Sequence, residues 1–103
     1  MFTAIVNYEL APSLSPEKVR QYYEQAVPKF EVMPGLIRKY FMLSEDGRVG
    51  GSVYLWETRD QAFSYHDESW KEFMRGKYGH RPQVTIYECP IIVDNVSGDV
   101  IVN

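Results

Sequence analysis

Two side chains capable of chemistry stand inside otherwise apolar segments of this 103-residue chain. Lys39 lies in the middle of LIRKYFML, residues 36–43, and His66 lies on an apolar helical stripe. A lone cation or imidazole is seldom enclosed without a partner or a task. Histidine is a common general base near neutral pH, and a lysine ammonium can donate hydrogen bonds to a developing anion. These two residues are the first candidates for a site.

Alternation along the expected strands adds hydrogen-bond donors to this pair. Successive residues of a strand point to opposite faces of a sheet. We group Asn7, Lys39 and Tyr54 on one face and expect them to supply donors to a bound anion, with His66 as the base. This arrangement requires that the same face lies beneath the helices.

Aromatic side chains near His66 would exclude water from such a site. Trp70 follows His66 by four residues, and Tyr65 precedes it directly. The candidate catalytic residues are therefore His66, Lys39 and Asn7, and the candidate substrate-binding residues are Tyr54, Trp70 and Tyr65.

Each candidate also has a purely structural interpretation. Lys39 could run along the core and pair with a helix carboxylate, and His66 could be a hydrogen-bonded core histidine. Asn7 could bond backbone at a strand end. Tyr54 and Trp70 could be packing residues. If Lys39 faces the core, its neighbour Arg38 points to the opposite face of the sheet. We expect that face to meet a second subunit, where Arg38 would form an ion pair with Glu88 or Glu9.

The elements that must position these residues follow from the pattern of apolar residues. Ser15 and Pro16 are typical of a helix start, and Glu45-Asp46-Gly47 is typical of a hairpin turn. A second helix begins at Thr58, and a further N-cap at Asp67 or Ser69 could break it. The expected strands are 2–9, 36–43, 50–57 and 83–89.

The order β-α-β-β-α-β predicts an α+β fold of the ferredoxin-like, split β-α-β type, an antiparallel sheet with two helices on one face. Neither face of the expected strands is polar, although two helices cover only one face. Because the uncovered face is also apolar, we predict a homodimer in which the two sheets pack together. We expect one domain over residues 1–95 and a C-terminal tail, 96–103, that crosses to the partner subunit.

Composition and charge argue against several kinds of partner and site. Eleven basic and fourteen acidic residues give a formal charge of −3, and no basic stretch exceeds a pair, which disfavours nucleic acids and anionic membranes as partners. The single cysteine, Cys89, and the absence of Cys/His ligand spacing argue against disulfides and metal sites. No apolar run is long enough for a membrane span, and the start MFTAIVNYEL lacks a charged leader region, so a cytoplasmic location is expected.

The run PGLIRKYFMLSEDGRVGGSVYLWETRDQAFSYHDESW resembles the YdhR-like monooxygenase family. That family lies within the dimeric α+β barrel superfamily, which includes the antibiotic-biosynthesis monooxygenases. The similarity extends from about Pro34 to Asn95 and depends on the PGL start, Lys39, GGSVYLW and the closing PIIVDN. It implies the dimeric fold and, through the family label alone, an oxygenase activity.

Some members of the superfamily oxygenate polycyclic phenols, anthrones or quinols without metal or flavin. The resemblance therefore implies a monooxygenase without a cofactor that acts on a small aromatic, phenolic or quinol-like molecule between sheet and helices. The alternatives are a non-catalytic dimer that binds small ligands or serves in stress responses, and an isomerase or lyase that uses His66 as a proton shuttle. The superfamily also contains haem-degrading enzymes, which resemble this chain in having an asparagine near the end of the first strand, where Asn7 stands. Their iron-binding histidine aligns near Met74, so haem degradation is disfavoured.

Overall fold

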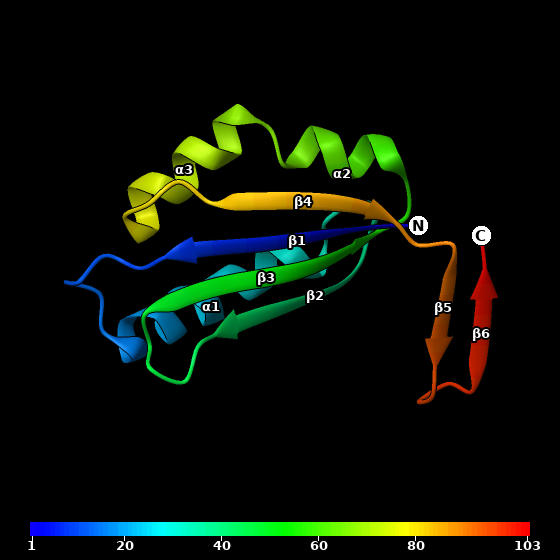
Figure 1. Cartoon of the computed structure of the whole chain (residues 1–103), viewed down its shortest axis with the longest axis horizontal. Helices are drawn as coiled ribbons and strands as arrows, with labels where there is room; N and C mark the ends of the chain where they lie inside the picture. Colours follow the sequence, from blue (N-terminus) through cyan, green and yellow to red (C-terminus); the bar gives the residue numbers. More distant parts are fainter.

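The computed structural model describes all residues, 1–103, and divides them into a main body and a C-terminal hairpin (Figure 1). The main body has four strands and three helices: β1 (Phe2–Glu9), α1 (Pro16–Glu31), β2 (Leu36–Leu43), β3 (Val49–Trp56), α2 (Arg59–Tyr65), α3 (Glu68–Tyr78) and β4 (Gln83–Glu88). The strands form one antiparallel sheet in the order β2-β3-β1-β4. This is the predicted ferredoxin-like α+β fold.

Local capping explains where the helices begin. The Ser15 hydroxyl accepts a hydrogen bond from the Lys18 amide at 3.1 Å and starts α1. The expected break in the second helix occurs at Asp67, whose carboxylate accepts from the Trp70 amide at 2.8 Å. Two short helices, α2 and α3, therefore replace one long helix, and the break lies beside His66.

All three helices cover the same face of the sheet, here called the helix face. The core consists of residues from β1, such as Ala4 and Val6, packed against Val19 of α1, Ala62 of α2 and Trp70 of α3. The other face, here called the open face, bears partly exposed apolar side chains, among them Ile5, Tyr40, Met42 and Tyr87.

Asn7 does not share a face with Lys39 and Tyr54, in contrast to the prediction. Lys39 lies opposite Tyr54 in the β2–β3 pairing, whereas Asn7 lies opposite Gly51 in the β1–β3 pairing. Gly51 and Tyr54 are three positions apart, so they point to opposite faces. Alternation determines the faces within one strand, but only the pairing register relates one strand to the next.

A β-bulge at the start of β2 also changes the expected alternation. Leu36 lies opposite Trp56, but Arg38 lies opposite Leu55, so the residue between them, Ile37, is extra. As a result, Leu36 and Lys39 both point to the helix face, although they are three positions apart.

The C-terminal residues form a separate two-stranded hairpin, β5 (Ile91–Asp94) and β6 (Asp99–Val102), that projects from the end of the main sheet (Figure 1). The predicted boundary after residue 95 falls in the turn of this hairpin. Arg38, on the open face, approaches Asp94 of the hairpin at 3.8 Å and is not paired with Glu88 or Glu9. None of the helices is long and apolar enough to cross a membrane.

Two glycines at the end of α3 provide a test of this packing. Gly79 has φ +104°, and a Cβ added there would lie 2.6 Å from the Cβ of Ala11. Gly79→Ala is therefore expected to lower the free energy of unfolding by about 1–3 kcal/mol. Gly76→Ala, within the helix and with nothing nearby, is the control and should raise it by about 0.5–1 kcal/mol. Urea unfolding measures both, and equal effects would contradict the described helix end.

Candidate functional site

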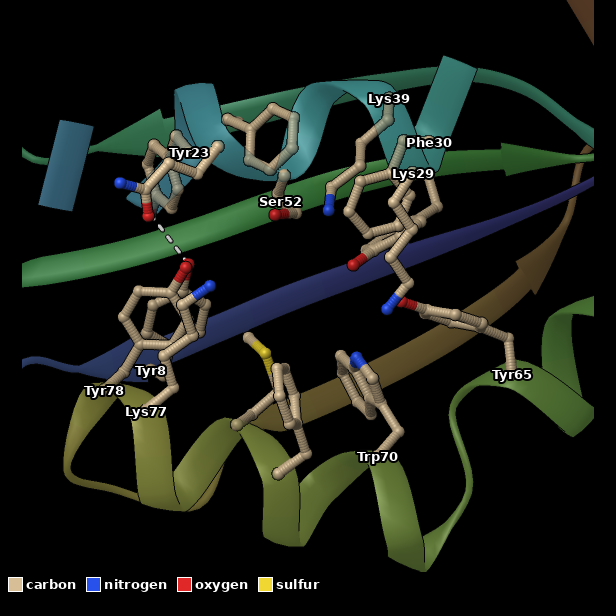
Figure 2. Close-up of a pocket in the computed structure, with 16 residues that line it drawn as sticks. Tyr8, Tyr23, Lys29, Phe30, Lys39, Ser52, Tyr65, Trp70, Lys77 and Tyr78 are labelled. Carbon is tan, nitrogen blue, oxygen red and sulfur yellow. Dashed lines mark hydrogen bonds between the residues drawn. The ribbon is translucent and has the colours of Figure 1, made fainter. Parts of the chain in front are cut away.

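A cavity of about 230 Å³ lies between α1, α3 and the helix face of the sheet (Figure 2). Most of the residues that line it are aromatic or aliphatic, and its charged side chains are three lysines without any carboxylate. The aromatic residues are Tyr8, Tyr23, Phe30, Phe41, Tyr54, Tyr65, Trp70, Phe73 and Tyr78, and the lysines are Lys29, Lys39 and Lys77.

Lys39 reaches into this cavity from β2, opposite Trp70 of α3 (Figure 2). Its Nζ lies 3.4 Å from the ring centre of Phe30 and 3.9 Å from that of Phe41. A third ring, that of Tyr54, is centred 4.4 Å away. The amine is therefore surrounded by aromatic carbon, and Lys39 takes part in none of the ion pairs of the structure.

This environment lowers the pKa of Lys39 to about 6. The main cause is desolvation, which penalises the charged form, and the positive charges of Lys29 and Lys77 add to it. A lysine with this pKa is mostly a neutral amine at pH 7. It can therefore accept a proton from a bound acid, which makes Lys39 the candidate general base.

The tyrosines of the cavity keep their protons. The Tyr23 hydroxyl donates to the carbonyl oxygen of Met42 at 2.8 Å, so its single proton is used and the Tyr8 hydroxyl donates to Tyr23 at 2.7 Å. Burial raises the pKa of Tyr8 and of Tyr54 far above the usual phenol value, and that of Tyr65 to about 12. These phenols are neutral hydrogen-bond donors at physiological pH.

His66 lies in the core and does not line the cavity. Its Nε2 accepts a hydrogen bond from the indole nitrogen of Trp56 at 3.2 Å, and its ring is centred 4.5 Å from the rings of both Tyr54 and Trp70. Desolvation first, and then the charges of Lys39 and Lys71, lower its pKa to about 3. The lone pair is used and the ring is enclosed, so this placement does not support His66 as the base. It favours the packing interpretation.

The structure thus brings together four of the six predicted site residues. Lys39, Tyr54, Tyr65 and Trp70 line one cavity, whereas His66 lies in the core and Asn7 is exposed on the open face. No group of three or more His, Cys, Asp or Glu side chains is placed to hold a metal ion.

Sequence reasoning missed the cavity residues that come from helix stripes. Tyr23 and Phe30 of α1, which are part of the core or packed against it, also line the cavity, and neither Lys29 nor Lys77 was among the candidate site residues. The sequence does contain a signal for these lysines. Lys77 follows Phe73 by four residues and Lys29 follows Ala26 by three, so each lysine lies on the same side of its helix as the apolar stripe.

No protein-family profile and no curated protein sequence matches the chain. Solved structures do. A Bordetella bronchiseptica protein provisionally assigned as an antibiotic biosynthesis monooxygenase is 19% identical over 85% of this chain and 95% of its own, with a TM-score of 0.66. A monooxygenase from the ActVA-Orf6 gene of Streptomyces coelicolor, in complex with nanaomycin D, is 14% identical over 85% of this chain and 86% of its own, with a TM-score of 0.63.

A variant of SnoaB, a cofactor-independent oxygenase from Streptomyces nogalater, is 10% identical over 85% of this chain and 91% of its own, with a TM-score of 0.62. At these identities the similarity shows the fold, and the fold is that of the antibiotic-biosynthesis monooxygenases. The more specific YdhR-like resemblance stays a prediction.

The burial of Lys39 predicts a measurable cost in stability. Between its native pKa of about 6 and the ordinary value of 10.5, the unfolded state binds the proton that the native state lacks. Wild-type stability therefore rises with pH across this range, and the penalty is complete below pH 6. Lys39→Met should be more stable than the wild type at pH 7, by at least about 1 kcal/mol. This advantage should shrink as the pH approaches 10.5.

Thermal unfolding followed from pH 6 to pH 10 measures this difference. Lys18→Met, at an exposed position of α1, is the control and should change stability little at any pH. A destabilised Lys39→Met variant would show that the amine is charged and stabilising in the native protein. An advantage that does not depend on pH would show that the pKa of Lys39 is not lowered by folding.

Proposed function

We propose that this chain is a monooxygenase that needs no cofactor and acts on a small phenolic or quinol-like molecule, with Lys39 as the general base. The observation that carries this proposal is an amine with a pKa of about 6 inside an aromatic cavity that contains no carboxylate. Such an amine can deprotonate a bound phenol, and the cavity can hold the resulting anion apart from water.

The reaction begins when neutral Lys39 takes the phenolic proton. The ammonium that forms stays beside the substrate anion, where the low local dielectric strengthens their attraction, and the neutral phenols of Tyr54 and Tyr65 can donate hydrogen bonds to it. A ring carbon ortho or para to the phenolate oxygen then forms a bond with one atom of O₂, and the peroxide anion that results takes back the proton from the Lys39 ammonium. This carbon bears one hydrogen in the phenol and is a CH₂ in the keto form, as in anthrone. Loss of water from the hydroperoxide removes the remaining C–H hydrogen and turns the carbon into a carbonyl, so the substrate supplies all four electrons that reduce O₂ and the neutral amine is restored.

Two further observations support this function. A dry cavity of about 150 Å³ accommodates benzene, so about 230 Å³ suits a molecule of one or two aromatic rings. Among proteins of the same fold, SnoaB is a cofactor-independent oxygenase, and the ActVA-Orf6 monooxygenase binds nanaomycin D. This second argument is an analogy between folds.

We further propose that the chain acts as a homodimer joined through its open face. Partly exposed apolar residues on three strands, such as Ile5 of β1, Tyr40 of β2 and Tyr87 of β4, would lose their contact with water there. The hairpin of β5 and β6 projects beyond the main body, and its apolar residues, including Ile91 and Val93, are also exposed. A hairpin in this position can cross to the partner.

Oxygen consumption tests the catalytic proposal. With 1,4-dihydroxynaphthalene, 2-naphthol or anthrone as substrate, we expect protein-dependent oxygen uptake whose kcat/KM rises with pH around an apparent pKa near 6, since Lys39 must be neutral. Lys39→Met should lower kcat/KM by about 100-fold or more, the usual contribution of a general base. Lys18→Met, outside the cavity, should retain the activity.

The other outcomes identify the alternative functions. Saturable binding without oxygen uptake would contradict the oxygenase and support a non-catalytic ligand-binding module. Substrate turnover under anaerobic conditions would contradict it in favour of an isomerase or lyase.

The dimer is tested by the mass of the protein in solution. Light scattering should give twice the monomer mass of 12.0 kDa at micromolar concentration. Ile5→Glu, which puts a charge on the central strand of the open face, should yield monomers, because an unpaired charge is costly in an apolar interface. Val32→Glu, at an exposed position after α1, should stay dimeric. A monomeric wild-type protein would refute the dimer.

A further inference from the structure

Two lysines stand at the solvent side of the cavity, and they approach it from different helices. Lys29 comes from α1 and Lys77 from α3, and the side chains of both are drawn around the cavity in Figure 2. Both amines lie close to the ring of Phe73, at 5.7 Å and 5.8 Å from its centre. Phe73 is 56% exposed and lines the cavity, so it marks the place where the cavity meets solvent. We call Lys29, Lys77 and the Phe73 ring the cavity mouth.

The positive charge at the mouth has no counterpart in the protein. Neither lysine takes part in an ion pair, although Lys71 and Arg75 of the same α3 pair with Glu68 and Glu72. No Asp or Glu lines the cavity, and the whole chain carries a net charge of −3. The site is therefore positive within an acidic protein, which concentrates anions at the mouth.

The two lysines also affect each other. The pKa of Lys77 is lowered, first by desolvation and then by the nearby charge of Lys29. Both lysines lower the pKa of Lys39 in the same way. An anion at the mouth would relieve this repulsion, because opposite charges within a few ångströms favour the charged form of each.

We infer that Lys29 and Lys77 bind an acidic group of the substrate, so that the preferred substrate is an aromatic carboxylate whose phenolic end reaches Lys39. The reaction of the phenolic end at Lys39 rests on the proposed function, whereas the binding of the acidic group by Lys29 and Lys77 does not. Lys29 is exposed and Lys77 half-buried, so a carboxylate at the mouth keeps part of its hydration while the ring enters the cavity. The reverse orientation would bury a carboxylate beside a neutral amine and aromatic rings.

A pair of ligands that differ in one carboxylate tests this inference. The probes are 6-hydroxy-2-naphthoate and 2-naphthol, which share the naphthalene ring and the phenol. Their dissociation constants are measured on the full chain by isothermal titration calorimetry in anaerobic buffer, which prevents oxygenation. We expect the naphthoate to bind about tenfold more tightly or better, with a preference that falls as salt is added.

Matched double variants then assign the preference to the mouth. Lys29→Met with Lys77→Met should bring the two dissociation constants to within about twofold of each other. Lys18→Met with Lys71→Met removes the same total charge from the same two helices, outside the cavity, and should retain the preference.

The remaining results distinguish the two proposals. Equal binding of the two probes by the wild type, a preference that survives in the Lys29/Lys77 double variant, or no binding of either probe would overturn the acid-binding mouth. Persistence of the preference without any oxygen uptake would instead remove the oxygenase proposal and leave the acid-binding mouth in place.

Discussion

The enclosure of one amine without a counter-charge is the constraint on which the site depends. The Nζ of Lys39 is held among the rings of Phe30, Phe41 and Tyr54, 3.4 to 4.4 Å from their centres. Desolvation makes the neutral amine the favoured form near pH 7, and the lysines at the mouth act in the same direction. In the proposed function, a side chain that is usually a fixed cation thereby serves as a base. A strongly lowered pKa inside a cavity supports the proposal that this position serves a function.

The fold provides this environment through several local features. The bulge in β2 and its pairing with β3 place Lys39 opposite Tyr54 on the helix face. The Tyr54 ring is stacked on Trp56 at 5.9 Å, and Trp56 in turn donates to His66, whose enclosed ring contacts Trp70. His66 therefore helps to fix the rings that line the cavity, although it does not reach the cavity itself. Removing it is expected to loosen the site, not to remove a proton acceptor.

The sequence predicted the elements and their order well because the signals for them are local. The cap at Ser15, the break at Asp67 and the β2–β3 hairpin are all where the pattern indicated. Relations between elements were harder. Asn7 was assigned to the wrong face because register between strands depends on tertiary pairing, which alternation does not reveal. His66 was assigned as the base because sequence does not show that a tryptophan ten residues earlier occupies its lone pair. Lys39 was predicted as a hydrogen-bond donor, and the role of base that we propose for it could not be predicted because desolvation is a property of the packed structure.

A direct titration of Lys39 tests the central claim. With lysine carrying ¹³C at the ε-carbon, the NMR signal that disappears in Lys39→Met identifies this residue, and its chemical shift follows protonation of the amine. We expect that signal to titrate with a pKa near 6, well separated from the ordinary lysine value of 10.5. A pKa near 10.5 would mean that Lys39 is an ordinary cation in the native protein, and the base, with the chemistry derived from it, would have to be abandoned.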